Sequence, residues 1–238
     1  MKAAGDVGTM LGRYRIVEMI GSGGMGVVHR AHDTTLGRDV AVKVLHGAES
    51  PERVQRLLRE AQAMAQLRHE HLVVIHDIVE ADHTVFIAME LIDGTSLREW
   101  LREPRAWREA LAAVIAAGRG LAAAHAAGVV HRDFKPENVL VDRAGGIKVA
   151  DFGLACAEPG GPPTRISDLE LTRTGALVGT PAYMAPEQHA GEQADTRSDQ
   201  FALAVTAWEA LWAQRPFTGS TYPELATAMR TGAIVKPP

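Results

Sequence analysis

The stretch HRDFKPENVLVDRAGGIKVADFG, from His131 to Gly153, decides the fold of this 238-residue chain. It sets three polar residues, Asp133, Asn138 and Asp151, beside two short apolar runs that predict strands joined by a glycine-containing turn. Carboxylate and amide oxygens suit Mg²⁺, which binds a few protein carboxylates together with phosphate oxygens. We therefore expect the acids to hold a metal, and Asp133 to accept a proton from a hydroxyl and orient it.

A glycine cluster lies upstream in GSGGMGVV, from Gly21 to Val28, with the spacing G-x-G-x-x-G. Glycines at such positions let backbone N–H groups approach phosphate oxygens without obstruction by a Cβ atom. A dinucleotide-binding fold would place a helix directly after the glycines, whereas this sequence predicts a strand. The cluster therefore predicts a phosphate-covering flap between two strands, and an ordinary glycine-rich hairpin is the alternative.

A lysine, Lys43, occupies the centre of the apolar strand-like run AVKVL. A lysine among apolar neighbours is uncommon unless an anion pairs with it. Glu60, close to the apolar stripe of the helix that follows, is the candidate partner. The alternative is that Glu60 belongs to a solvated face, because other charged residues occupy the same helix.

The chain changes its pattern at Asp93-Gly94. The first part predicts mainly antiparallel strands over Tyr14–Ile20, Val27–Ala31, Asp39–Leu45, Leu72–Val79 and Thr84–Leu91, with one helix over Pro51–Leu67. The second part predicts helices over Leu97–Arg102, Ala106–Ala127, Asp199–Ala213 and Tyr222–Thr231, strands over Val139–Val141 and Ile147–Val149, and a long loop over Ala157–Gly179. The fold class is therefore α+β, with a small sheet lobe and a larger, mainly helical lobe.

Composition excludes several other classes. The net charge of −4 argues against a nucleic-acid-binding protein, and the single cysteine cannot form an internal disulfide. The alanine-rich run from Leu111 to Val130 contains Arg119 and His125, so it predicts a buried helix and not a membrane span. We expect a cytoplasmic protein with no membrane segment in this chain, although a segment outside it could anchor the intact protein.

Taken together, the motifs resemble those of eukaryotic-type (Hanks-type) protein kinases, and more narrowly the bacterial serine/threonine kinases. The resemblance covers residues 14–238, with a small lobe over 14–89, a hinge over 90–94 and a large lobe over 95–238. The motifs that carry it are Gly21-x-Gly23-x-x-Gly26-x-Val28, Ala41-Val42-Lys43, Glu60, His131-Arg132-Asp133-x-Lys135-x-x-Asn138, Asp151-Phe152-Gly153 and Ala185-Pro186-Glu187.

This resemblance implies a bilobal kinase fold that binds ATP between the lobes and uses Mg²⁺ or Mn²⁺. Lys43 would contact the α- and β-phosphates and pair with Glu60. Asp133 would be the catalytic base, with Lys135 neutralising charge on the transferred phosphoryl group. The remaining implied roles are metal binding by Asp151 and Asn138, and anchoring of the catalytic loop by Asp199. Thr180 would hydrogen-bond Asp133 and Lys135 and so help to seat the substrate hydroxyl.

The nucleotide pocket implied by the resemblance combines the glycine flap, an adenine slot and hinge backbone. Met89 would be the gatekeeper at the back of the slot, and core packing is the alternative role for the apolar members. The implied pocket residues are Gly21, Ser22, Gly23, Gly24, Met25, Gly26, Val28, Ala41, Lys43, Met89, Glu90, Ile92 and Leu140.

Regulation by phosphorylation is implied as well. Arg132 precedes the base, as in kinases switched by their activation loop, and Thr172 and Thr174 fall where related bacterial kinases autophosphorylate. Phosphate on a threonine adds about −1.5 to −2 charge and can order a loop through arginine pairs. The alternative is two polar residues in a disordered loop. The implied partners are ATP, proteins with Ser/Thr acceptors, and a second copy of the chain for trans-autophosphorylation.

The chain departs from the family pattern at its end, where the last helices of the large lobe are missing. Glu187 is therefore expected to lack its usual arginine partner, and we expect marginal stability. Two competing functions follow. The first is a pseudokinase, which binds nucleotide without transferring phosphate. Loss of Lys43, Asp133, Asn138 or Asp151 is its usual sign, and all four residues are retained. The second is a small-molecule phosphotransferase of related fold, which the Ala-Pro-Glu motif disfavours.

Overall fold

The computed structural model describes residues 6–23, 26–45, 51–81, 84–152 and 180–237. At Gly23, Ala81, Thr84, Thr180 and several positions of the first helix, including Glu60, the description covers the backbone alone. The chain forms two compact units, Met1–Asp93 and Gly94–Pro238.

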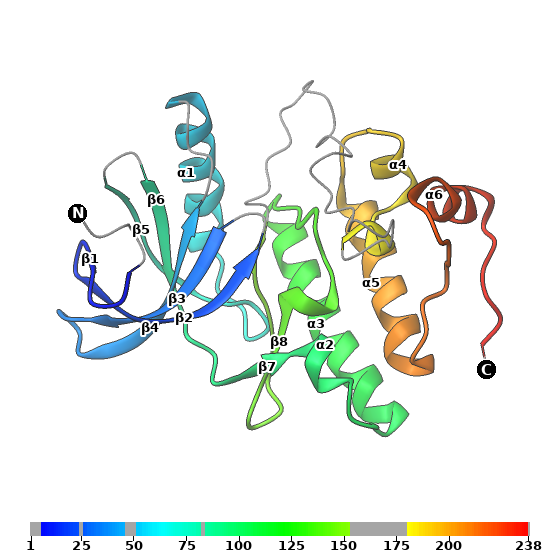
Figure 1. Cartoon of the computed structure of the whole chain (residues 1–238), viewed down its shortest axis with the longest axis horizontal. Helices are drawn as coiled ribbons and strands as arrows, with labels where there is room; N and C mark the ends of the chain where they lie inside the picture. Colours follow the sequence, from blue (N-terminus) through cyan, green and yellow to red (C-terminus); the bar gives the residue numbers. More distant parts are fainter. Residues whose placement is uncertain (1–5, 24–25, 46–50, 82–83, 153–179, 238) are drawn as a thin grey trace. The chain divides into compact units, whose positions relative to one another are not determined.

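The first unit is an antiparallel sheet with one helix among its described residues (Figure 1). Its six strands lie in the order β1-β2-β3-β4-β6-β5, and each pair of neighbours is antiparallel. Helix α1 (Pro51–Ala65) packs against β5 and β6. The strands are β1 (Met10–Leu11), β2 (Tyr14–Gly23), β3 (Gly26–Asp33), β4 (Arg38–Leu45), β5 (Ile75–Ala81) and β6 (Thr84–Met89).

Side chains at alternating positions of the strands point to the same face of the sheet, and on one face they form a buried cluster. The buried cluster contains Leu11, Tyr14, Ile16, Ala31, Val40, Val42, Val44, Phe86 and Ala88. Burying an aliphatic or aromatic side chain of this size contributes about 1.5–3 kcal/mol. The Tyr14 hydroxyl donates to Asp77 Oδ2 at 3.0 Å and accepts from Arg13, so the polar end of the most buried aromatic ring is satisfied on β5.

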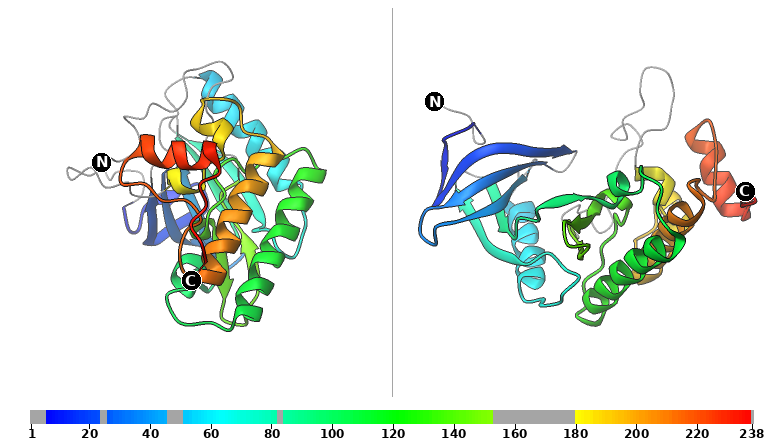
Figure 2. Two further views of the ribbon diagram at one scale, coloured as in Figure 1. Left: turned by 90° about the vertical axis from the view of Figure 1, so that its right-hand side faces the viewer. Right: turned by 90° about the horizontal axis from the view of Figure 1, so that it is seen from below.

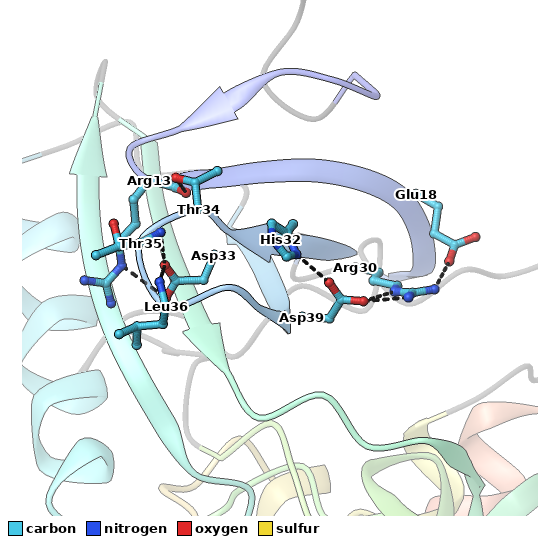
Figure 3. Close-up of polar contacts among 9 residues, drawn as sticks. All are labelled: Arg13, Glu18, Arg30, His32, Asp33, Thr34, Thr35, Leu36 and Asp39. Atoms are coloured by element: carbon cyan, nitrogen blue, oxygen red, sulfur yellow. Dashed lines mark hydrogen bonds and ion pairs between the residues drawn. The ribbon is translucent and has the colours of Figure 1, made fainter.

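Two aspartates fix the β3–β4 hairpin (Figure 3). Asp33 accepts the backbone N–H groups of Thr35 and Leu36 at 3.0 and 3.1 Å, which closes the turn. Asp39 accepts from Arg30 Nε at 2.9 Å and lies 2.9 Å from His32 Nδ1. These hydrogen bonds lower the pKa of Asp39, first through His32 and then through Arg30. The hairpin thereby fixes the register of β4, the strand that contains Lys43.

The second unit combines a small sheet with helices. Its strands β7 (Gly94–Ser96), β8 (Val139–Asp142) and β9 (Ile147–Val149) form a three-stranded antiparallel sheet. The other elements are α2 (Leu97–Trp100), α3 (Trp107–Ala126), η1 (Pro136–Asn138), η3 (Thr180–Tyr183), α4 (Pro186–His189), α5 (Thr196–Trp212) and α6 (Tyr222–Thr231).

Helices α3 and α5 lie side by side in the second unit (Figure 1, Figure 2). Small residues allow this close approach: a Cβ atom on Gly118 would come within 3.1 Å of Leu203 Cδ2. The buried face of α3 consists of Ala110, Ala113, Val114, Ala117, Gly120, Leu121 and Ala124. Over the residues that the structure describes, no helix combines the length and apolar character needed to cross a membrane.

Each expected helix and strand is present among the described residues, with ends that differ, whereas β1, β7 and α4 were not expected. Helix α5 begins at Thr196 and not at Asp199, because Asp195 accepts the Arg197 N–H at 2.7 Å and caps the helix. Strand β5 begins at Ile75, three residues later than the apolar run that starts at Leu72. The long loop expected over Ala157–Gly179 lies outside the described residues.

Candidate active site

The segment from His131 to Asp133 is held by hydrogen bonds to Asp199 of α5. Asp199, with a side chain only 1% exposed, accepts the backbone N–H of His131 at 2.7 Å and that of Arg132 at 2.8 Å. His125 Nε2 lies 2.7 Å from the same carboxylate. The anchoring role that the sequence predicted for Asp199 is confirmed.

Arg132 has a left-handed backbone conformation, with φ of +68°. This region is unfavourable for a residue with a Cβ atom and costs of order 1–3 kcal/mol. The flanking hydrogen bonds hold it: Asp199 accepts the Arg132 N–H, and Gln188 Nε2 donates to the Arg132 carbonyl at 2.9 Å. The left-handed conformation of Arg132 therefore determines the direction in which the side chain of the next residue, Asp133, projects from the backbone.

The Asp133 carboxylate is 9% exposed and pairs with Lys135, whose Nζ lies 2.7 Å from Oδ2. The second oxygen, Oδ1, is buried and has no hydrogen-bond partner among the described residues. Asp133 also lines a small cavity, together with Tyr183, Met184 and Gln188. One carboxylate oxygen is thus neutralised while the other can still accept a proton, which is the arrangement that a general base needs.

Asn138 and Asp151 lie at the same end of the β8–β9 ladder. Asn138 directly precedes β8, its carbonyl accepts the Ala150 N–H at 2.8 Å, and Asp151 is the next residue. The Asn138 Nδ2 group donates to the Asp133 carbonyl at 2.8 Å, so the amide oxygen points away from that carbonyl. The donor set of an amide oxygen and a carboxylate, both hard oxygen ligands, fits a Mg²⁺-type ion.

His131 is fully buried and is held as the neutral imidazole. Its Nε2 lies 3.0 Å from the Ala150 carbonyl, and its Nδ1 accepts the Asp133 N–H at 3.4 Å. Burial lowers the pKa of His131 below its ordinary value of 6.5, and the nearby carboxylates of Asp199, Asp133 and Asp151 oppose this shift. The ring packs on Phe152, with centroids 4.6 Å apart.

This lowered pKa predicts loss of stability in acid. The unfolded chain takes up the proton more readily than the folded one, so the contribution is complete above pH 6.5 and is lost as the pH falls through the lowered pKa. For one such histidine the loss between pH 7 and pH 5 is at most about 2 kcal/mol. Urea unfolding at several pH values, compared between wild type and His131→Gln, should show the shallower pH dependence in the variant.

Burial also lowers the pKa of His29, His76 and His189, and these residues remain in both proteins of this comparison. The difference between the two curves therefore isolates His131. Parallel curves would show that His131 does not stay neutral in the folded protein.

In the first unit, three candidate nucleotide-binding residues form one row across neighbouring strands. Gly21 of β2 is opposite Val28 of β3, and Val28 is opposite Lys43 of β4. Lys43 is 3% exposed and also pairs with Ile87 of β6, so it is buried at the middle of the sheet. The register brings the flap, an apolar side chain and the ammonium group to one strip of the sheet.

The candidate adenine-slot residues of this unit lie two positions further along the same strands. Ala41 pairs with Met89, and both side chains are buried. Glu90 donates its N–H to the Val74 carbonyl at 2.9 Å, and the Val74 N–H donates back to the Glu90 carboxylate at 3.3 Å. This reciprocal pair fixes the chain just after β6. Leu140, the slot candidate of the second unit, lies on β8 opposite Ser96.

Several predicted site residues lie partly or wholly outside the described residues. The backbone of Glu60 lies in α1 and that of Thr180 begins η3, but their side chains lie outside the described atoms. The candidates Gly24, Met25, Thr172 and Thr174, and also Gly153, lie outside the described residues. Ser22, Gly23 and Gly26 form the ends of β2 and β3, and Ile92 follows β6.

Sequence reasoning missed a polar cluster around Arg98 of α2. Its Nε donates to Glu137 at 2.8 Å and its Nη1 to Glu209 at 2.7 Å, while Nη2 contacts the Tyr183 hydroxyl. Tyr183 in turn donates to Glu209. Arg98 thus joins η1, which contains Asn138, to η3 and α5. Nothing local to Arg98 in the sequence indicates these partners.

Glu187, expected to lack its arginine, has another partner in the described structure. The Ser198 hydroxyl donates to Glu187 Oε1 at 2.6 Å. The pKa of Arg197 is raised mainly by Asp195, and the negative charge of Glu187 adds to this effect. The carboxylate of the Ala-Pro-Glu motif is therefore stabilised by the start of α5.

Comparison with known proteins identifies the family. The model of the protein kinase domain matches residues 14–236. The chain belongs to the protein kinase family. The serine/threonine-protein kinase PknA of Mycobacterium tuberculosis is 40% identical over 220 residues, which are 89% of this chain and 49% of that protein. A probable serine/threonine-protein kinase of Bifidobacterium longum, pknA2, is 42% identical over 213 residues, which are 87% of this chain and 27% of that protein.

A solved structure agrees with this assignment. The crystal structure of a double mutant of the Mycobacterium tuberculosis PknI kinase domain has a TM-score of 0.71 and 28% sequence identity, and it covers 97% of this chain and 86% of its own. The expected resemblance to bacterial serine/threonine kinases and the kinase-like α+β fold are confirmed. Membership implies ATP as the co-substrate and a divalent metal ion. The chain spans about half or less of the length of these curated relatives.

Proposed function

We propose that this kinase domain transfers the γ-phosphoryl group of ATP to serine and threonine hydroxyls of proteins. The observation that carries the proposal is a cluster of polar residues in the second unit. The Asp133 carboxylate pairs with Lys135, and the Asp133 carbonyl accepts a hydrogen bond from Asn138. Asp151 directly follows Ala150, whose N–H donates to the Asn138 carbonyl. The serine/threonine-kinase names of the curated relatives support the choice of acceptor.

In this mechanism Asp133 orients the acceptor hydroxyl and accepts its proton, most readily on the oxygen that lacks a partner. Lys135, held 2.7 Å from the other oxygen, supplies positive charge near the site of transfer. Thr180 is proposed to help position the hydroxyl. Because phosphoryl transfer requires little covalent participation by the protein, most of the catalysis comes from this positioning and charge stabilisation.

Residues of the first unit would bind the nucleotide. Lys43 would contact the α- and β-phosphates and Glu60 would pair with Lys43, while backbone N–H groups of the glycine cluster would cover the phosphates. The burial of Lys43 in the row with Gly21 and Val28 supports this role, because a buried ammonium group needs an anion nearby. The adenine ring is proposed to contact Val28, Ala41, Met89 and Leu140, with hinge backbone from Glu90 to Ile92.

Asn138 and Asp151 are proposed to hold Mg²⁺, for which Mn²⁺ can substitute. The ion would neutralise charge on the β- and γ-phosphates. Asn138 is suited to this role because its own Nδ2 group is occupied by the Asp133 carbonyl, which leaves the amide oxygen directed away from that carbonyl. Hydrogen bonding thereby links the metal ligand to the backbone of the base.

A transfer assay tests the proposal. The chain is incubated with Mg²⁺ and γ-labelled ATP, with casein as the protein acceptor, and the label is located by mass spectrometry. We expect label on serine or threonine with wild type and a large loss with Lys43→Met. ATP binding without transfer would favour a pseudokinase, and label on an aminoglycoside or choline but not on casein would favour a small-molecule phosphotransferase.

The same experiment addresses regulation. We propose that Thr172 and Thr174 are autophosphorylated, and that one copy of the chain phosphorylates another within a transient homodimer. Label on a Lys43→Met chain after mixing with wild type would support transfer between copies. Label confined to other positions would contradict the assignment of these two threonines.

A further inference from the structure

Gln188, the residue after the Ala-Pro-Glu motif, uses both ends of its side chain. Its Nε2 donates to the Arg132 carbonyl at 2.9 Å, and its Oε1 accepts the Ala185 N–H at 3.0 Å. Because a donor contacts a carbonyl and an acceptor contacts an N–H, the orientation of the amide is determined. The side chain therefore bridges two segments that are 56 residues apart in the sequence.

One end of the Gln188 side chain contacts the Arg132–Asp133 peptide group, whose orientation affects where the Asp133 side chain points. The Arg132 carbonyl belongs to the peptide bond that leads into Asp133, and Arg132 has the left-handed φ of +68°. Asp199 holds the N–H side of Arg132, at 2.8 Å, and Gln188 holds the carbonyl side. A residue in an unfavourable conformation keeps it only where surrounding contacts impose it, so each of these two bonds contributes to the bend.

Gln188 also lines the small cavity that Asp133 lines, together with Tyr183 and Met184. The Asp133 carboxylate carries its unpartnered Oδ1 atom in the same region of the second unit. Rotation of the Arg132–Asp133 peptide would shift the carboxylate relative to this cavity. Displacements of about 1 Å in a catalytic group can lower a rate by on the order of 10²-fold.

We propose that Gln188 is a positioning residue for phosphoryl transfer: by hydrogen bonding to the Arg132 carbonyl it fixes the peptide plane that aims Asp133. This inference rests on the proposed role of Asp133 as the base. Gln188 touches neither the phosphoryl group nor the acceptor. Its effect falls on the transfer step and leaves binding of ATP unchanged.

The test compares Gln188→Met, which removes both hydrogen bonds at similar volume, with Gln200→Met, the same exchange at an exposed position of α5. Single-turnover transfer to casein, KM for MgATP and the melting temperature are measured for each. We expect Gln188→Met to slow transfer about 10–100-fold, with KM within about twofold of wild type, and Gln200→Met to match wild type.

A second variant, Gln188→Glu, separates positioning from loss of packing. The introduced carboxylate can still accept the Ala185 N–H, but it donates to the Arg132 carbonyl only when it is protonated. The ratio of its transfer rate to that of Gln188→Met should therefore rise as the pH is lowered from 8 to 6. Dividing the two rates cancels any pH dependence of transfer that both variants share.

Hydrogen exchange of the peptide containing residues 131–135 gives a readout that needs no catalysis. Exchange there should be faster in Gln188→Met than in wild type and unchanged in Gln200→Met. Transfer rates within twofold of wild type for both Gln188 variants, with unchanged exchange, would overturn the inference while leaving the proposed function intact. Wild-type transfer rates for Asp133→Asn would instead exclude Asp133 as the base, and no transfer to casein by the wild-type chain would overturn the proposed function.

Discussion

Replacing Asp133 by asparagine is expected to lower the rate of phosphoryl transfer by about 10²–10⁴-fold, the usual contribution of a positioned general base. Asparagine keeps the size of the side chain but cannot accept the proton. It also removes the charge that pairs with Lys135 at 2.7 Å. Because Asp133 is assigned to the acceptor hydroxyl and not to the nucleotide, KM for MgATP should change by no more than about twofold.

The measurement is single-turnover transfer from labelled ATP to casein, together with nucleotide affinity by calorimetry. Glu192→Gln, a similar loss of one carboxylate at an exposed position, is the control and should behave as wild type. A rate for Asp133→Asn within about threefold of wild type would exclude Asp133 as the base, whatever the affinity for ATP.

Much of the candidate site in the second unit, formed by Asp133, Lys135, Asn138 and Asp151, could be predicted from the sequence because these residues are close together in the chain. Asp133, Lys135 and Asn138 occupy one short loop, and the two apolar runs that follow form a hairpin, β8 and β9, which brings Asp151 back beside Asn138. The pattern of alternation and the glycine pair fix that hairpin locally. No distant contact has to be known.

The contacts that sequence reasoning missed are those whose partners are set by tertiary packing. Gln188 of α4 and Ser198 of α5 are ordinary polar residues, and only the folded chain places them against Arg132 and Glu187. Strand β7 was missed for a related reason. Only Thr95 of its three residues favours a strand, a run too short to indicate one, and Gly94–Ser96 is extended because β8 pairs with it.

Gly94 illustrates this dependence at the start of the second unit. A Cβ atom at this position would come 2.0 Å from the Val141 carbonyl oxygen, so only glycine permits the two strands to approach as they do. In the sequence, Asp93-Gly94 indicates a turn or a boundary. The close backbone contact that makes glycine necessary becomes visible only in the folded structure.

The largest effect on stability is expected from Asp199→Ala. The Asp199 carboxylate is buried, accepts two backbone N–H groups at 2.7 and 2.8 Å and lies 2.7 Å from His125 Nε2. Removing it leaves buried donors without a partner, each at a cost of about 1–3 kcal/mol. We expect the free energy of unfolding to fall by about 3–5 kcal/mol, as for the loss of one partner from a buried charged pair.

Asp195→Ala, the same exchange at the half-buried N-cap of the same helix, is the matched control. It removes the cap on the Arg197 N–H and should cost about 1 kcal/mol. Urea unfolding followed by circular dichroism measures both variants, and a loss for Asp199→Ala no larger than that for Asp195→Ala would contradict the anchoring role. The left-handed Arg132 backbone should also relax once its N–H is released, so Asp199→Ala should transfer phosphate slowly even at temperatures where it remains folded.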